Sequence, residues 1–475
     1  FSSGYPPRHG GVTPPAGGGW PRPAWRERAA PAGRSPLAPH PGSRMLEIAS
    51  LLLLLTAALA FVNARFLRMP QAVGLLLTAL VSAGALKAAG VLGLVDLAPV
   101  LRIVESIDFR ETLLDGMLGL LLFAAAQHTD GAALRGQALP VTMLATLGTV
   151  LCAAVIAAGA FLVAPLFGVE LPIPWALAFG LLLAPTDPIA VGALLKQAGV
   201  PTALQKTITG ESLFNDGVSV VLFLAVLEVI TDGAAPALPD IARLLALEVG
   251  GGIAFGLGLG WLAVRLLRQI DDYQVEILIT LALAFGGFTL ARHLHVSGVL
   301  GMVALGLVIG RQAGGGAVVS ARTKQRLDDF WELVDEFLNA TLFVLIGVEV
   351  LILDLRGQAL VLGLVAIPIV LLARWLSVVG AIGPVRRRLH GWPTGSIALL
   401  TWAGVRGGIS IALALALPEG EGRTEILAVT YVVVVFSILV QGLTVAKVAT
   451  RVLGPVPAGA ARDEDAVPEP VGTTA

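Results

Sequence analysis

Thirteen apolar stretches follow one another along the chain from Met45 onward, separated by short polar loops. Most approach the roughly 20 apolar residues that a helix needs to cross a bilayer. They lie near residues 45–62, 70–94, 111–127, 139–164, 172–196, 206–230, 241–267, 273–291, 297–312, 334–353, 359–382, 394–418 and 425–449. The pattern predicts an all-α polytopic membrane protein with about 13 transmembrane helices.

The composition supports the same class. Of the 475 residues, 56% are hydrophobic and 14% are charged, against about 25% charged in soluble proteins. So few charges could not cover a water-soluble fold, which excludes a soluble enzyme, a disordered chain and a nucleic-acid binder. Cys152 is the single cysteine, so no intrachain disulfide can form, and the sequence has neither HExxH nor a Cys/His cluster for zinc.

The two ends of the chain differ from its middle. Residues 1–44 contain ten of the 29 prolines, eight glycines, six arginines and no apolar run, a composition typical of a disordered leader. Because the first methionine is Met45, we expect the natural start there and a leader that is not native; a genuine disordered tail is the alternative. Residues 45–452 form the expected transmembrane domain, and 453–475 a short cytoplasmic tail.

Basic residues are distributed unevenly between the two sets of alternating loops. The odd-numbered loops and the tail carry 17 of them: Arg65, Arg68, Arg135, Lys196, Lys206, Arg265, Arg268, Arg311, Arg322, Lys324, Arg326, Arg386, Arg387, Arg388, Lys447, Arg451 and Arg462. The even-numbered loops carry 7: Lys87, Arg102, Arg110, Arg243, Arg292, Arg356 and Arg423. Cytoplasmic loops are enriched in Lys and Arg, so we expect the N-terminus outside and the C-terminus in the cytoplasm.

Two of the predicted helices are interrupted in mid-membrane. The stretch 172–196 contains Pro185 and Pro188, which remove two backbone donors, and 394–418 contains the sequence AGVRGG. The interrupted helices are seven segments apart, an odd number, so they run in opposite directions. Segments 1–6 and 8–13 could therefore be inverted repeats. Paired broken helices of this kind are typical of the midplane site of a secondary transporter; proline kinks without function are the alternative.

Polar residues cluster within one apolar helix, in the stretch 206–230. Ser212 and Asp216 are four residues apart and share a face, and Glu211 and Asn215 share the adjacent face. Such groups inside the membrane are costly, so they need partners. We therefore expect this helix to contribute to the site.

The available partners are three charged residues in other predicted helices. Arg374 and Arg406 are basic residues deep inside apolar stretches, and Asp187 lies in the first break. Carboxylates, a hydroxyl and freed carbonyls suit a small alkali cation, and a carboxylate can instead bind a proton. One aspartate that binds either Na⁺ or H⁺ is sufficient for exchange.

Asp216 is our candidate for this shared carboxylate, with a structural ion pair as the alternative. Glu211 is expected to be the structural partner of Arg374, and Asp187 to be a ligand or a helix-end stabiliser.

Other features of the apolar stretches favour structural roles. Four glutamates lie nearer segment ends, where interfacial solvation is expected: Glu228, Glu248, Glu276 and Glu349. Gly252, Gly256 and Gly260 repeat every fourth residue, which predicts a close helix-packing face.

The motif GESLFNDG at residues 210–217, preceded by PTDP at 185–188, resembles the cation:proton antiporter-1 family, the NhaP/NHE-type Na⁺/H⁺ exchangers. The segments SGVL at 297–300, LFVLIG at 342–347 and WAGVRGG at 402–408 are similar to further motifs of that family. The resemblance covers about Met45 to Arg451. It implies an NhaA-like inverted-repeat fold with core and dimerisation subdomains, a homodimer, and broken helices that cross at the midplane.

The resemblance also implies residue roles. It implies that Asp216, Asp187, Ser212 and the backbone of Thr186 bind the cation and the proton. It also implies that Glu211 and Arg374 form a structural ion pair and that Arg406 stabilises the core. Asn215 matches the asparagine of the family's Asn-Asp pair, where electrogenic relatives carry a second aspartate, so electroneutral 1:1 exchange is implied. The chain departs from some members at residues 124–126, three alanines where those members carry an acid.

We therefore expect a secondary Na⁺(Li⁺)/H⁺ antiporter of a bacterial inner membrane, working by alternating access without a cofactor. K⁺/H⁺ exchange remains an open alternative. A cation channel would need a continuous polar pore. A hydrolase would need a nucleophile with a base, and neither a GxSxG motif nor a histidine at mid-span is present.

Overall fold

The computed structural model describes residues 41–105, 109, 111–129, 131–233, 243, 246–315, 321–353, 357–389, 392–420 and 422–454. The chain divides into two units, Phe1–Glu47 and Ile48–Ala475. Of the first unit, residues 41–47 are described, and they are helical. The packing reported below is that of the second unit.

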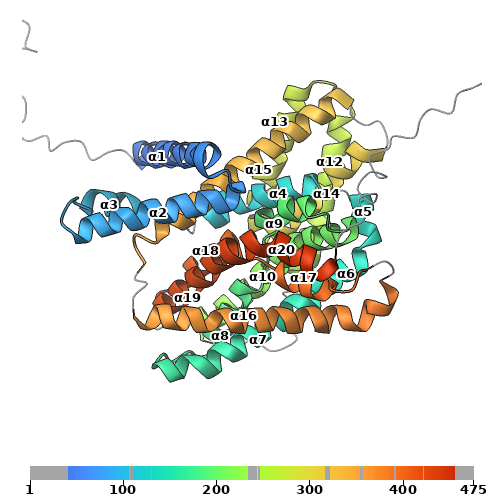
Figure 1. Cartoon of the computed structure of the whole chain (residues 1–475). Coiled ribbons are helices and arrows are strands. Elements are labelled where there is room, and N and C mark those ends of the chain that lie inside the picture. The colour runs from blue at the N-terminus through green and yellow to red at the C-terminus, as the bar shows by residue number, and fades with distance from the viewer. Residues whose placement is uncertain are drawn as a thin grey trace, which may run out of the picture. The chain divides into compact units, whose positions relative to one another are not determined.

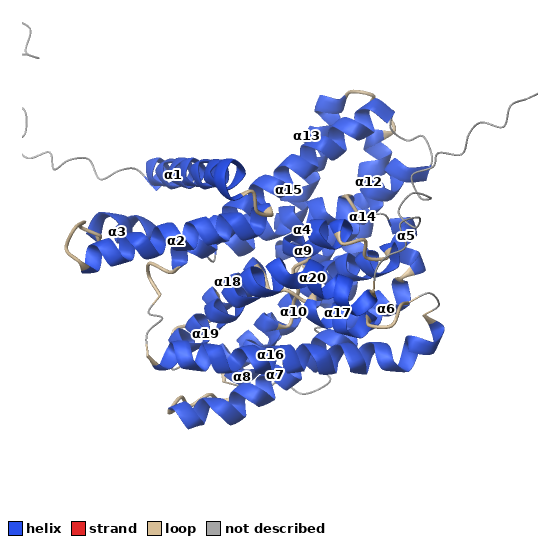
Figure 2. Ribbon diagram, in the orientation of Figure 1, coloured by secondary structure: helices blue, strands red, loops and turns tan. Residues whose placement is uncertain are grey.

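The described residues form helices and loops, with no strand among them (Figure 2). The helices are α1 (Pro41–Val62), α2 (Gln71–Val91), α3 (Ala98–Glu105), α4 (Leu118–Gln127), α5 (Gly131–Gly136), α6 (Ala138–Met143), α7 (Thr149–Val163), α8 (Ile173–Leu183), α9 (Ile189–Gln197), α10 (Thr202–Asp232), α12 (Gly251–Leu267), α13 (Tyr273–His293), α14 (Gly298–Gly315), α15 (Ala321–Glu349), α16 (Gln358–Ile382), α17 (Ser396–Trp402), α18 (Gly408–Leu415), α19 (Arg423–Phe436) and α20 (Gly442–Leu453). Short 3-10 and π-helical turns, η1 (Asn63–Leu67), η2 (Glu111–Met117), η3 (Leu144–Gly148), η4 (Ala164–Phe167), η5 (Ala246–Gly250), η6 (Gly383–Arg388) and η7 (Ser437–Gln441), extend several of them.

Eight helical stretches in the described part of the chain are long and apolar enough to cross a membrane. They are Glu47–Leu67, Gln71–Val91, Ala138–Phe167, Thr202–Asp232, Ala246–Leu267, Tyr273–His293, Gln358–Arg386 and Arg423–Leu453. The prediction of an all-helical membrane protein is therefore confirmed.

The five remaining predicted segments also coincide with helices, but each departs from a long uniform span. Two are broken, as α8 with α9 and α17 with α18; α4 and α14 are shorter; and α15 carries many charges in its first half.

Two of the sequence expectations concern the ends of the chain. Helix α1 begins at Pro41, four residues before Met45. A proline is tolerated at this position because the first turn of a helix does not use its backbone N–H. Residues 1–40 of the expected leader and residues 455–475 of the expected tail lie outside the described residues.

Helices α12, α13 and α14 pack against one another, and α14 also packs on α4 (Figure 1). On α12, a Cβ atom at Gly252 would lie 2.5 Å from the Ser297 carbonyl oxygen, and one at Gly256 would lie 2.1 Å from that of Gly301. The predicted glycine face is therefore confirmed as a close contact, and its partner is α14.

Around α10, four helices provide the frame of the site. Helix α10 packs on α8, α8 packs on α7, and α16 packs on both α7 and α19 (Figure 1). Because both breaks lie within this frame, the polar residues of α10 are buried beside irregular backbone.

Candidate functional site

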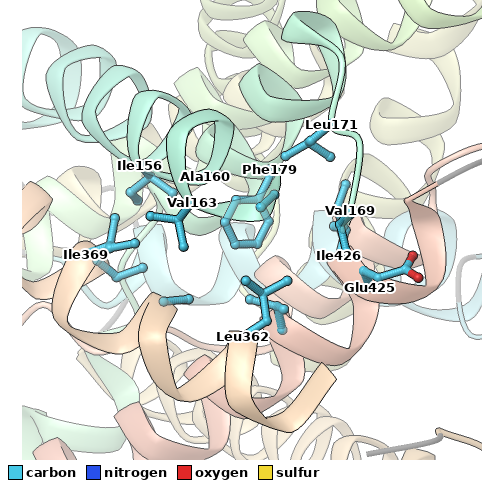
Figure 3. Close-up of a pocket in the computed structure, with 14 residues that line it drawn as sticks. Ile156, Ala160, Val163, Val169, Leu171, Phe179, Leu362, Ile369, Glu425 and Ile426 are labelled. Atoms are coloured by element: carbon cyan, nitrogen blue, oxygen red, sulfur yellow. The ribbon is translucent and has the colours of Figure 1, made fainter. Parts of the chain in front are cut away.

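Two cavities lie near α10 and the helices packed around it, and their linings differ in chemistry. The first, with an empty volume of about 480 Å³, is lined by apolar side chains from α7, α8, α16 and α19. Figure 3 shows Phe179, Leu362 and Ile369 around it, with the carboxylate of Glu425 at one end. A single carboxylate among hydrocarbon does not make a set of hard oxygen ligands for an alkali cation.

The second cavity, with an empty volume of about 660 Å³, lies at the two helix breaks. Its polar lining includes all four residues predicted to bind the cation and proton: Asp187, Asp216, Ser212 and Thr186. The structure thus brings together groups that lie up to 30 positions apart in the sequence.

The first break spans residues 184–188, between α8 and α9. Here the two prolines end the helical hydrogen-bond pattern, and the freed carbonyls find other donors. The guanidinium of Arg406 donates to the carbonyls of Ala184 and Pro185, at 2.8 Å from the Pro185 oxygen. The hydroxyl of Ser212 donates to the Thr186 carbonyl. The break is therefore stabilised by the side chains of Arg406 and Ser212, which lie far from it in the sequence.

The second break spans residues 403–407, between α17 and α18, and it touches the first directly. The backbone N–H of Asp187 donates to the Val405 carbonyl at 2.7 Å. The N–H of Arg406 donates to Ser437 Oγ at 2.8 Å. The Arg406 side chain is 1% exposed. Arg406 thus belongs to one break and donates to the carbonyls of the other.

Asp187 lies against the N-terminal ends of two half-helices. Its Oδ1 accepts the N–H of Ile189 at 2.8 Å, which places the carboxylate at the start of α9. A Cβ atom at Gly407 would lie 2.2 Å from Asp187 Oδ2, so the chain leading into α18 also meets this carboxylate. Helix N-termini carry partial positive charge and favour an anion. The carboxylate therefore lies where a helix-end stabiliser would lie, which is one of the two predicted roles, and it also lines the cavity, as a ligand would.

The polar residues of α10 are buried, and two of them bind the first break. Asn215 Nδ2 donates to Thr186 Oγ1 at 3.0 Å, and Ser212 donates to the carbonyl of the same residue. Asp216 is 7% exposed and lines the cavity. The break and α10 are thus held in a fixed relation, with Asp187 and Asp216 both facing the cavity.

The predicted ion pair between Glu211 and Arg374 is present. Arg374 Nη2 lies 2.8 Å from Glu211 Oε2, and Nη1 contacts Oε1. Arg374 also donates to the Leu400 carbonyl, at 3.1 Å from Nη2. Both side chains are almost fully buried. Glu211 is therefore occupied by its cation and does not line the cavity, as expected for a structural partner.

Sequence reasoning missed four polar residues that line the cavity: Thr129, Thr209, Asn339 and Ser410. Asn339 lies on α15, where its Nδ2 donates to Asp335 Oδ1 at 3.0 Å. Ser410 lies in the first turn of α18. Single neutral polar residues in apolar helices carry no distinctive pattern, so proximity to the breaks was the available signal. Ala125, within the alanine run at residues 124–126, also lines the cavity.

Two of the glutamates expected at a solvated interface are buried. Glu276 is 0% exposed and Glu349 is 5% exposed. Among the described residues, neither oxygen of the Glu276 carboxylate has a hydrogen-bond partner. The prediction of interfacial solvation was wrong for both, because neighbouring helices cover these helix ends.

Comparison with known proteins gives consistent results. Residues 51–451 match the family described as "Sodium/hydrogen exchanger, transmembrane". The chain is 43% identical to the Na⁺/H⁺ antiporter NhaP of Pseudomonas aeruginosa over 413 residues, covering 86% of this chain and 97% of that protein. It is 35% identical to the Na⁺/H⁺ antiporter NhaH of Halobacillus aidingensis, covering 83% and 94%.

A similar fold occurs in a solved structure. The sodium proton antiporter MjNhaP1 of Methanocaldococcus jannaschii superposes with a TM-score of 0.68 at 19% identity, covering 87% of this chain and all of that one. At this identity the similarity concerns the fold alone.

Proposed function

Since the chain belongs to the sodium/hydrogen exchanger family, we propose that it is a secondary antiporter that exchanges Na⁺, or Li⁺, for H⁺ across a membrane. The two relatives named above are Na⁺/H⁺ antiporters, and they are matched over nearly their whole length. The protein is thus a transporter, not an enzyme.

The observation that carries this proposal is the cavity at the two breaks. It presents two carboxylates, Asp187 and Asp216, together with the hydroxyl of Ser212 and Thr186. A dehydrated Na⁺ binds hard oxygen ligands of this kind. In our proposal Asp216 binds either the cation or the proton, and Asp187 with Thr186 and Ser212 completes the cation shell.

The supporting residues hold this geometry. Asn215 and Arg406 attach the first break to α10 and to the second break. The pair Glu211–Arg374 connects α10 to α16. None of these three contacts adds a free negative charge, which supports the one-for-one, electroneutral exchange that the resemblance implies.

Alternating access would then expose the cavity to one side of the membrane at a time. In our proposal all 13 apolar segments cross the membrane as two inverted repeats, segments 1–6 and 8–13, with the broken helices crossing at the midplane. The direct contact between the breaks supports this arrangement. We also propose a homodimer in the cell membrane, with the N-terminus outside and the C-terminus in the cytoplasm.

The exchange activity can be tested in everted membrane vesicles whose interior has been made acidic, with a fluorescent probe that reports the pH difference across the membrane. Na⁺ and Li⁺ should each dissipate the gradient, and the apparent KM for Na⁺ should rise as the pH falls because protons compete. A parallel K⁺ titration distinguishes K⁺/H⁺ exchange. Cation flux without any change in vesicle pH would contradict an antiporter.

A further inference from the structure

One wall of the ion cavity comes from the second broken helix, through Gly408, Ile409 and Ser410. The Ser410 side chain is 1% exposed. Within the described part of the chain, its hydroxyl has no hydrogen-bond partner. A buried hydroxyl without a partner is destabilising. Because this one also lines the cavity that contains the two carboxylates, it is available to bind a ligand there.

The position of Ser410 in α18 explains why its hydroxyl is free. Buried hydroxyls in the interior of helices commonly donate to a carbonyl one turn earlier, as Thr78 does to Gly74 at 2.8 Å and Thr207 to Ala203 at 2.8 Å. Ser410 is the third residue of α18, and the residue four positions earlier is Arg406, in the break. Ser410 is therefore not preceded by a complete helical turn.

The same region of α18 lies against one of the carboxylates. Gly407, directly before α18, approaches Asp187 so closely that a Cβ there would overlap Oδ2. Ser410 follows three residues later and lines the same cavity as Asp187 and Asp216. Its oxygen is therefore a neutral hard donor beside two anionic ones.

We propose that Ser410 is a further ligand of the transported cation, contributed by the second broken helix. This inference rests on the proposed exchange function and deepens it. The cation would then be bound by oxygens from both breaks, with Thr186 and Asp187 from the first and Ser410 from the second. A proton on a carboxylate needs no such shell, so Ser410 would set cation affinity and selectivity without setting proton affinity.

The experiment compares Ser410→Ala with Ser219→Ala in reconstituted vesicles. Ser219 is a matched control: it is 0% exposed, its hydroxyl has no partner among the described residues, and it does not line the cavity. Ser410→Ala should raise the apparent KM for Na⁺ about 10-fold or more, with the pH at half-maximal rate under saturating Na⁺ unchanged. Ser219→Ala should retain the wild-type KM, and Ser410→Thr, which keeps the hydroxyl, should restore most of the affinity.

A wild-type KM in Ser410→Ala, or equal changes in the two alanine variants, would overturn the inference. If Ser410→Ala does not fold, Ser410→Cys replaces it, because a thiol has similar size but is a poor ligand for Na⁺; the same rise in KM is expected, and a wild-type KM is contrary. An absence of Na⁺-driven proton flux in the wild-type protein contradicts the exchange function itself. Normal exchange by the wild type and by Ser410→Ala contradicts only the role of Ser410.

Discussion

Replacing Glu211 with alanine removes the anion from a guanidinium that lies in the protein interior. Arg374 is 4% exposed and Glu211 is 1% exposed. The substitution eliminates two charge-assisted hydrogen bonds, and among the described residues it leaves the Leu400 carbonyl as the remaining hydrogen-bond acceptor of the Arg374 guanidinium. A carbonyl dipole does not neutralise a buried cation.

The magnitude follows from this burial. Breaking a buried ion pair by removing one partner costs about 3–5 kcal/mol, which is roughly a hundredfold to a few thousandfold in the folding equilibrium. Replacing both partners with leucine removes the unpaired charge together with its anion. The double variant Glu211→Leu/Arg374→Leu should therefore be more stable than Glu211→Ala.

The measurement is the thermal unfolding of detergent-purified protein, read by size-exclusion chromatography after heating, together with the folded yield from membranes. The chain offers a matched control in the pair Arg423–Glu419, whose N–O distance is 2.7 Å and whose glutamate side chain is 88% exposed. Exposed pairs contribute about 0–1 kcal/mol, so Glu419→Ala should unfold close to the wild-type temperature.

The comparison also defines what would refute the reasoning. If Glu211→Ala unfolds at the same temperature as Glu419→Ala, the buried pair does not stabilise the core. If the double leucine variant is less stable than the single alanine variant, the loss arises from packing and not from an unpaired charge.

Three further predictions concern the breaks and the topology. Gly407→Ala should fold but lose most exchange, because its Cβ would displace Asp187; Gly258→Ala, where a Cβ meets no other atom within 4 Å, is the control, and equal exchange rates in the two variants would contradict the contact. Arg406→Lys should lower thermal stability by about 1–3 kcal/mol, because lysine carries its donors on one nitrogen, whereas the guanidinium contacts two carbonyls through Nη1 and Cys152 Sγ through Nη2; an unchanged unfolding temperature is the contrary result. In a Cys152→Ser background, an impermeant maleimide should label Arg102→Cys but not Arg268→Cys in intact cells, and the reverse pattern would invert the proposed orientation.

Much of the fold could be predicted from hydrophobic length alone, because each apolar stretch has to be a helix to satisfy its backbone in lipid. The two breaks were also predictable. Pro185 and Pro188 remove backbone N–H donors from one predicted helix, and the glycines of AGVRGG weaken the other predicted helix. The sequence rules that identify a break do not predict which residues form hydrogen bonds with the backbone groups freed there. That Arg406 of one break binds the carbonyls of the other is a long-range contact, and it required the structure.

The candidate site was likewise predictable only in part: its charged residues were predicted, and its neutral polar residues were not. Charged residues in apolar helices are recognisable in the sequence because they are costly there, which identified Asp187, Asp216, Glu211 and Arg374. Ser410 and Asn339 are neutral polar residues that belong to no motif identified in the sequence. It is their position at the cavity that identifies them. Glu276 and Glu349 show the limit of reasoning by distance from a segment end, because burial there depends on which helices pack nearby.

The central claim is that Asp216 binds either the cation or the proton. The most direct measurement is the Na⁺-driven change of pH in vesicles containing Asp216→Asn, beside wild-type protein at equal folded amount. The amide retains the size of the carboxylate but cannot exchange a proton for a cation, so the variant should show a folded chromatographic profile and no Na⁺-dependent proton flux. Exchange by Asp216→Asn at the wild-type rate would show that the shared carboxylate lies elsewhere.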